Sequence, residues 1–284
     1  MIQKGSFPVA MIPYVNMAPY RQMKTPPNCH FVPLVPKMSI SALRNNNVLA
    51  AAVPVGGLLM LKDIVEPLGK FGIAGKRESM SVMFFSDRPF EHMDRNCTIR
   101  LTNDSASSVR LLYYLLNTLQ GHNNLPCMVF DQKAVNGELL IGDQALRKAG
   151  RIKGWGPLAG QKDEIDGKDL SIVTDLASYW RKLFDLPFVF ARWMVRKDAP
   201  ENVKMILREW LEEFRQKEAE MVSACIEPSA RLLNIDTAVI ERYFQVIHRC
   251  LDDHDLLGQE RFITEFQKVD KNLLFSFASE KDGV

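Results

Sequence analysis

The sequence has no excess of charge of either sign. Its 284 residues include 36 Lys and Arg against 34 Asp and Glu, which leaves a formal net charge of +2. A protein that binds nucleic acid by neutralising phosphates has a basic face or a basic tail. The charge balance therefore argues against a nucleic-acid partner. With 46% hydrophobic and 25% charged residues, the composition is that of a globular protein.

Paired cysteines and long apolar runs are also missing. The five cysteines are scattered, odd in number and without a CxxC or zinc-binding spacing. This pattern predicts reduced thiols and a cytoplasmic location. No apolar run is long enough to cross a membrane. Prolines interrupt the apolar N-terminal segment and no cleavage site follows it, so we expect neither a signal peptide nor a membrane partner.

The common catalytic motifs are absent as well. The chain has no GxSxG, Walker, GxGxxG or HExxH sequence. His248 and His254 stand among Asp252, Asp253 and Asp255. This group is either a metal site or the solvated end of a helix, and its spacing favours the helix end. We therefore expect no metal, and an enzyme of this sequence would use hydroxyls, amides and helix ends.

Strand-like and helix-like segments alternate along the first part of the chain. Strands are predicted at residues 7–12, 31–35, 49–55, 81–86, 98–102, 127–130 and 139–141, with helices at 39–45, 58–64 and 107–119. Such alternation is typical of an α/β protein with mainly parallel sheets. Residues 150–168, rich in glycine, lysine and aspartate, are predicted to form a loop.

Residues 175–193 combine an amphipathic helix with an apolar strand. Leu176, Tyr179, Trp180 and Leu183 share one helical face, and an apolar run follows Pro187. The strand that begins at Ser81 has a similar character, so we expect the chain to leave one lobe near residues 85–89 and to return near 188–193. The first lobe would contain residues 1–88 and 190–284, the second residues 89–189, with a ligand cleft between them.

The last part of the chain is predicted to be helical. Asp198 is expected to cap a helix that has Pro200 in its first turn, and Asp236 to cap another. A final helix is predicted near residues 259–269.

Three serines stand where a strand leads into the helix of residues 107–119. Ser105, Ser107 and Ser108 occupy three of four consecutive positions. The first turn of a helix has free amide groups and the positive end of the helix dipole, so it binds carboxylate or phosphate. An ordinary serine N-cap explains the same residues, and both interpretations stay open.

Four further residues are candidates for a ligand site, each with a structural alternative. Asn16 follows the first strand between two prolines, and its amide could contact a substrate or form an Asx-turn. Ser81 begins a strand and either faces the cleft or lies at a strand edge. Gly142 and Asp143 end another strand and either face the cleft or cap a helix that starts at Gln144.

Several of these segments together resemble the chorismate dehydratase family of menaquinone biosynthesis by the futalosine route. The segments are IPYVNMAPY, SVMFFSDRP, LTNDSASSVRLLYYLL, LLIGDQALRK and DLASYWRKLFDLPFVFARW, in this order, followed by YFQVIHRCLDDHDLLGQERF. The resemblance covers essentially the whole chain. It implies a two-lobed clamshell like that of type II periplasmic binding proteins, with a mixed sheet in each lobe and a helical C-terminal return.

The resemblance also implies an activity, which is the removal of water from chorismate to give 3-[(1-carboxyvinyl)oxy]benzoate without a metal or an organic cofactor. Asn16 and Ser81 match the asparagine and serine of the family's substrate pocket and would be catalytic. Ser107 and Ser108 match a Thr-Ser pair at the helix start, where with Ser105 they would bind a substrate carboxylate. Gly142 and Asp143 would complete the substrate site.

The chain departs from the family pattern at Arg77-Glu78, Phe184-Asp185 and Arg192. Residues of this kind lining the cleft would favour a different anion. Two alternatives to a chorismate dehydratase therefore stay open: a non-catalytic cytoplasmic binding protein for a small carboxylate, and a related lyase of the same pathway with a different substrate. A genomic neighbourhood of futalosine-pathway genes would favour the lyase.

Overall fold

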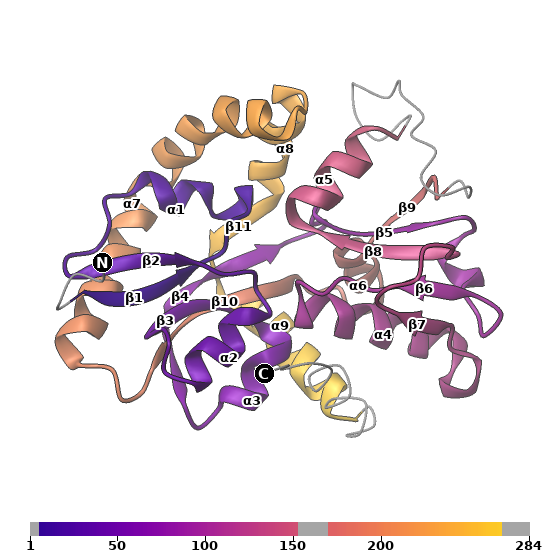
Figure 1. The fold of residues 1–284 in the computed structure, drawn as a ribbon, viewed down its shortest axis with the longest axis horizontal. Helices are drawn as coiled ribbons and strands as arrows, with labels where there is room; N and C mark the ends of the chain where they lie inside the picture. The colour runs from indigo at the N-terminus through magenta and orange to yellow at the C-terminus, as the bar shows by residue number, and fades with distance from the viewer. Residues whose placement is uncertain (1–5, 153–169, 269–284) are drawn as a thin grey trace.

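The computed structural model describes residues 6–152 and 170–268, which form two β-sheets with helices on their faces (Figure 1). The first sheet has the strand order β11-β4-β10-β3-β1-β2 and the second the order β7-β6-β8-β5-β9. The strands of the first sheet are β1 (Phe7–Met11), β2 (Cys29–Pro33), β3 (Ala50–Pro54), β4 (Val65–Gly75), β10 (Phe188–Arg196) and β11 (Ile247–Cys250). Those of the second are β5 (Val82–Ser86), β6 (Thr98–Arg100), β7 (Cys127–Val129), β8 (Gly137–Ile141) and β9 (Ile172–Asp175).

Helices cover both sheets and form most of the C-terminal part of the described chain. They are α1 (Ala18–Gln22), α2 (Met38–Arg44), α3 (Leu58–Leu61), α4 (Ala106–Gln120), α5 (Gly142–Gly150), α6 (Leu176–Phe184), α7 (Glu201–Leu233), α8 (Thr237–Val246) and α9 (Asp253–Lys268). In Figure 1, α1, α7 and α8 lie along one side of the first sheet and α2 and α3 along the other. None of these helices within the described residues is long and apolar enough to cross a membrane.

Both sheets are mixed, as the family resemblance implies. β1 runs parallel to β2 and β3, whereas β10 runs antiparallel to β3 and β4. The mainly parallel sheet expected from the alternation of elements is therefore wrong. A helical crossover makes two strands of one sheet parallel, whereas β10 is reached through α6 from β9 of the second sheet.

The chain passes between the sheets at different points from those expected. β5 pairs with β8 and β9, so the passage from the first sheet to the second lies at residues 76–81 and not at 85–89. The return lies at residues 185–187, because Phe188 already belongs to β10. The predicted loop at residues 150–168 lies almost entirely outside the described residues.

The sequence patterns missed two strands of the first sheet, β4 and β11. β4 contains Pro67 and three glycines, which read as a loop. Pairing with β10 on one side and β11 on the other overrides this local preference. Gly72 is required there, because a Cβ at this position would lie 2.3 Å from the Ala191 carbonyl oxygen, where the register of β10 and β4 shifts.

The helix and strand of residues 175–193 form as predicted and pack into an aromatic cluster. Trp180 on α6 contacts Phe188 on β10 and Phe262 on α9, with ring centroids 5.4 and 5.8 Å apart. The Trp180 Nε1–H also donates to the Pro187 carbonyl at 3.2 Å. Buried aromatic rings contribute large apolar areas to a core, so this cluster anchors the return of the chain to the first sheet.

One of the two predicted aspartate caps in the C-terminal part is confirmed. Asp236 accepts a hydrogen bond from the Ala238 amide and begins α8. Asp198 instead forms an ion pair with Arg196 at 2.6 Å, and Pro200 occupies the N-cap position of α7. The last helix begins at Asp253, six residues before the position expected from the sequence.

The buried carboxylate of Glu138 ties the second sheet to α5, and its lowered pKa predicts how the stability of the fold depends on pH. Glu138 on β8 is 3% exposed and accepts hydrogen bonds from Arg100, at 2.5 Å, and from Lys148. Burial raises the pKa of Glu138, but the two cations outweigh burial and leave its pKa below the usual value. The contacts therefore stabilise the fold above the pKa of the unfolded carboxyl, and this stabilisation disappears as the pH falls through the lower pKa of the folded state.

We expect Glu138→Gln to lower the free energy of unfolding by roughly 3 kcal/mol at neutral pH, because it leaves two cations without their partner. Urea denaturation at a series of pH values measures the difference. The variant and the parent chain should converge at acidic pH, where Glu138 is protonated. A difference that does not change with pH would contradict the assignment.

Candidate functional site

Asn16 lies in a turn whose carbonyl groups are held by two arginines. The turn follows β1, and Asn16 is the middle residue of a short 3-10 helix, η1 (Val15–Met17). Arg21 donates to the carbonyls of Ile12, at 2.8 Å, and Tyr14, at 3.0 Å. The Arg249 Nε–H donates to the Asn16 carbonyl at 2.9 Å. The backbone that carries the Asn16 side chain is therefore fixed on two sides.

The side-chain oxygen of Asn16 is buried and has no hydrogen-bond partner among residues 6–152 and 170–268. The alternative of an Asx-turn is wrong, because in such a turn this oxygen would accept a backbone hydrogen bond. Buried polar atoms are nearly always paired, and an unpaired one costs about 1–3 kcal/mol. Asn16 Oδ1 is thus an acceptor that a ligand could satisfy.

Ser81 stands directly before β5, at the passage between the two sheets. It is 4% exposed, and its Oγ accepts a hydrogen bond from the Tyr243 hydroxyl at 3.1 Å. Burial raises the pKa of Tyr243 well above its usual value, so this hydroxyl stays protonated and remains a donor. The hydroxyl proton of Ser81 is then left to donate to another acceptor.

A single carboxylate, that of Asp175, fixes the turn before Ser81. It accepts from the Ser79 and Met80 amides, both at 2.8 Å, and from the Ser79 hydroxyl at 3.1 Å. It also caps α6 through the amides of Ala177 and Ser178. Met80 has a φ of 55°, in the left-handed region that residues other than glycine rarely adopt. These contacts are what hold the unfavourable backbone of Met80 in place.

Gly142 and Asp143 contact the turns of both Ser81 and Asn16. α5 begins at Gly142, so the start expected at Gln144 is two residues late. The Gly142 amide donates to the Ser81 carbonyl at 2.7 Å. A Cβ on Gly142 would lie 2.7 Å from the Tyr14 ring, and its φ of 55° also requires glycine.

The Asp143 carboxylate links the second sheet to the Asn16 turn. It accepts from the Val15 amide at 2.9 Å. Burial raises the pKa of Asp143, while the Val15 amide and the charges of Arg147 and Arg21 oppose this rise. Asp143 therefore binds backbone next to Asn16 and does not serve as the cap of a helix at Gln144.

The three serines before α4 have different partners. Ser105 is the N-cap, accepting from the Ser108 amide at 3.0 Å and donating to the Ser108 hydroxyl at 2.9 Å. Ser107 donates to the Phe190 carbonyl and accepts from the Gly56 amide, both at 3.0 Å. The N-cap interpretation is confirmed for Ser105. Binding of a carboxylate by the three serines stays a prediction.

A small pocket opens at the start of α4. Its lining consists of Lys37, Thr102, Ser105, Ala106, Val109, Arg110 and Phe130. Arg110 is 3% exposed and donates to the Gly56 carbonyl at 2.6 Å. Burial lowers the pKa of Arg110 to about 10, so the guanidinium keeps its charge at neutral pH. Two cationic side chains beside a helix N-terminus suit an anion.

Tyr14 links the Asn16 turn to the loop before α4. Its hydroxyl donates to Asp104 Oδ2 at 2.9 Å, in the loop just before α4. Burial and the nearby Asp104 raise the pKa of Tyr14, so the hydroxyl stays protonated. Sequence reasoning missed Tyr14, Tyr243, Arg249 and Asp175 as parts of the site. Only Tyr14, two residues before Asn16, had a local signal.

The residues that depart from the family pattern are exposed or contact other parts of the protein. Arg77 is exposed, and Glu78 forms an ion pair with Arg242 at 2.9 Å. Phe184 packs on Trp180, and Asp185 ends α6 in the left-handed conformation that glycine adopts most easily. Arg192 is 7% exposed and donates to the Gly69 carbonyl and to Gln259. These contacts give no support to a different substrate.

The histidine and aspartate group near residue 250 forms the start of α9, and Asp252, Asp253 and His254 are exposed there, as the helix-end interpretation predicts. Asp255 differs from this expectation because it is buried. His248 Nε2 lies 2.8 Å from Asp255 Oδ2, and Asp255 is fully buried. Asp252 and Asp255 each accept from the other's amide, which begins α9. Among the described residues, no three His, Cys, Asp or Glu side chains are arranged to bind a metal ion.

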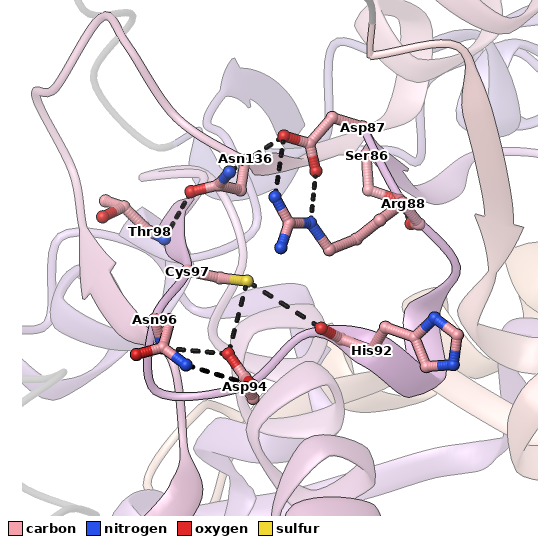
Figure 2. Close-up of polar contacts among 9 residues, drawn as sticks. All are labelled: Ser86, Asp87, Arg88, His92, Asp94, Asn96, Cys97, Thr98 and Asn136. Carbon is pink, nitrogen blue, oxygen red and sulfur yellow. Dashed lines mark hydrogen bonds and ion pairs between the residues drawn. The ribbon is translucent and has the colours of Figure 1, made fainter.

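All five cysteines are free thiols, as expected, and Cys127 is exposed. Figure 2 shows Cys97 with its sulfur directed toward Asp94 and the His92 carbonyl, at 3.8 and 3.9 Å. In the same view the Asp87 carboxylate binds Arg88 and Asn136. This network lies at the end of β5 opposite to Ser81, and it supports the turn between β5 and β6.

A family model described as menaquinone biosynthesis matches residues 7–268. The chain is 26% identical over 261 residues to a chorismate dehydratase of Thermus thermophilus, covering 88% of this chain and 91% of that protein.

Solved structures with the same fold have lower sequence identity. One is a protein of Archaeoglobus fulgidus, with a TM-score of 0.63, 14% identity, and 95% and 99% of the two chains covered. Another is the periplasmic aliphatic sulphonate binding protein of Escherichia coli, with a TM-score of 0.56, 14% identity, and 94% and 88% coverage. The periplasmic-binding-protein-like fold implied by the family resemblance is therefore confirmed.

The contacts of Asp175 predict a large effect of replacing it. In Asp175→Asn, one acceptor oxygen becomes an NH₂ group that faces amide donors. We expect a loss of roughly 2–3 kcal/mol in unfolding free energy, because several donors lose their acceptor. Urea denaturation measures it. Asp236→Asn is the matched control, since Asp236 caps α8 through one amide, and we expect a loss of about 1 kcal/mol or less. Equal losses in the two variants would contradict the role given to Asp175.

Proposed function

The chain belongs to the menaquinone biosynthesis family, and from that premise we propose that it is a carbon–oxygen lyase that dehydrates chorismate to 3-[(1-carboxyvinyl)oxy]benzoate. The match to a chorismate dehydratase along most of both chains supports this activity. We place the reaction in the cytoplasm, on the futalosine route to menaquinone.

The buried, unpaired side-chain oxygen of Asn16 is the observation that carries the proposal. Chorismate has a ring hydroxyl that must leave, and a hydroxyl can donate to Asn16 Oδ1. Ser81 supplies the complementary group, a hydroxyl whose proton is free to donate because Tyr243 occupies its oxygen. Asn16 would orient the hydroxyl that leaves, and Ser81 would stabilise negative charge that develops on an oxygen of the substrate.

The start of α4 would bind a carboxylate of the substrate. Ser105 lines a pocket there with Lys37 and Arg110. In our proposal the two sheets belong to two lobes, and the ligand lies between them in contact with Asn16 from the first and the start of α4 from the second. Gly142 and Asp143 would act by holding the turns of Ser81 and Asn16.

The dehydration needs only orientation of the substrate and stabilisation of charge from the protein. A ring carbon loses a proton, the ring C–O bond breaks, and the hydroxyl departs as water while the ring becomes aromatic. Aromatisation drives the reaction, so orientation and charge stabilisation suffice without a metal or an organic cofactor. A carboxylate of the substrate is our candidate for the base, because the Asp143 carboxylate is engaged by the Val15 amide.

Two further functions fit the same site. A non-catalytic binding protein for a small carboxylate would use the same fold and the same pocket at α4, as the likeness to a sulphonate binding protein illustrates. A lyase of the same pathway with another substrate would use the same hydroxyl and amide groups.

Mixing the purified chain with chorismate and following ultraviolet absorbance and product mass distinguishes these functions. The proposal predicts a product lighter by one water. Asn16→Ala and Ser81→Ala should lower kcat by about 100-fold or more, as the loss of a group that stabilises the transition state does. Ser41→Ala, on α2, should leave kcat unchanged. Tight binding without turnover would favour the binding protein, and turnover of another carboxylate alone would favour the other lyase.

A further inference from the structure

Arg249 is a buried cation of the first sheet that contacts the Asn16 turn. Its side chain comes from β11, near the C-terminal end of the described chain, and is 1% exposed. The Nε–H donates to the Asn16 carbonyl at 2.9 Å, although the two residues are 233 positions apart in the sequence. No sequence pattern links them.

The other contacts of Arg249 compensate poorly for its burial. Nη1 lies 3.4 Å from the Glu218 carboxylate and 3.3 Å from the Ile247 carbonyl, and the guanidinium faces the Phe244 ring at 5.2 Å. Nη2 is buried without a hydrogen-bond partner among the described residues. Burying a charge is costly unless it is well paired. Stability alone therefore explains this arginine badly, since an apolar side chain of similar size would fit at lower cost.

We propose that Arg249 is a positioning residue that acts through Asn16. This inference rests on the proposed function, in which Asn16 Oδ1 orients the hydroxyl that leaves. Arg21 fixes the carbonyls of Ile12 and Tyr14, at the start of the turn, and Arg249 fixes the carbonyl of Asn16 itself. Without Arg249 the Asn16 peptide keeps, within the described part of the chain, only the hydrogen bond from the Met17 amide to the Tyr14 carbonyl, so we expect the turn and the Asn16 side chain to be held less firmly. A displacement of about 1 Å at a reacting group can lower a rate about 100-fold.

The geometry of the guanidinium explains why this position needs an arginine. The planar guanidinium presents several N–H groups at fixed angles, so it can hold the Asn16 carbonyl while it also contacts Glu218 and the Ile247 carbonyl. A lysine at this position keeps the charge but has a single flexible donor group. Charge and geometry can therefore be separated by substitution.

The test compares Arg249→Lys and Arg249→Gln with two controls. Glu218→Gln removes the charged partner of Arg249 without touching Asn16, and Arg208→Gln removes an exposed arginine of α7 that pairs with Glu66. Steady-state kinetics with chorismate give kcat and KM. We expect kcat to fall about 100-fold in Arg249→Gln and about 10-fold or more in Arg249→Lys, with KM changed less than about threefold. Both controls should stay within about twofold of the parent.

Hydrogen exchange in the absence of substrate gives a readout that does not depend on the reaction. The Val15 and Met17 amides bond to Asp143 and to the Tyr14 carbonyl, so their exchange reports the order of the turn. We expect faster exchange at these amides in Arg249→Gln, with unchanged exchange in the strands of the second sheet. Faster exchange at these amides supports the positioning role even if the parent chain fails to dehydrate chorismate. Failure to dehydrate chorismate would overturn only the proposed function.

Chemical rescue adds a second test for the kinetic role. In Arg249→Ala, millimolar guanidinium should restore part of kcat, whereas methylammonium should restore less, because it lacks the planar set of donors. The inference is overturned by a folded Arg249→Gln chain with the parent's kcat and exchange rates. It is also overturned by equal kinetic loss in Glu218→Gln, or by faster exchange throughout both sheets, since either result assigns Arg249 to stability.

Discussion

The Asp175 carboxylate is the interaction on which the rest of the site depends. It gathers amide and hydroxyl donors from Ser79, Met80 and the first turn of α6, and so joins the passage into the second sheet to the helix that leads out of it. The left-handed backbone at Met80 is unfavourable, and these hydrogen bonds hold it. Ser81 follows Met80 directly. The position of its hydroxyl is therefore set by Asp175, which ends the last strand of the second sheet along the chain.

The remaining contacts spread outward from Ser81 and make one connected site from distant parts of the chain. Gly142 holds the Ser81 carbonyl, and Asp143, the next residue, holds the Val15 amide beside Asn16. Tyr243 reaches Ser81 and Arg249 reaches Asn16, so the C-terminal part of the chain contacts both residues. The candidate site is therefore built by elements of both sheets, since Asn16 follows β1 and Arg249 lies on β11 of the first sheet, and Ser81 precedes β5 of the second.

Local patterns were enough to predict most elements, but not the contacts between them. α4, α6 and β10 have strong periodicity or long apolar runs and form as predicted. β4 was missed because its proline and glycines mask a strand that exists only through its two neighbours. Asn16 and Ser81 are candidates from their positions beside predicted strands and from the family resemblance, whereas Tyr243 and Arg249 contact them across 162 and 233 residues of sequence, which no local pattern encodes.

In the proposed site, Asn16 Oδ1 is buried and unpaired because it receives the hydroxyl of the ligand. A crystal structure of a Ser81→Ala chain with bound chorismate tests this claim most directly. We expect the ring hydroxyl oxygen at about 2.6–3.2 Å from Asn16 Oδ1, with a carboxylate at the start of α4. A ligand bound away from Asn16, or an Asn16 oxygen paired only with protein groups in the complex, would contradict it.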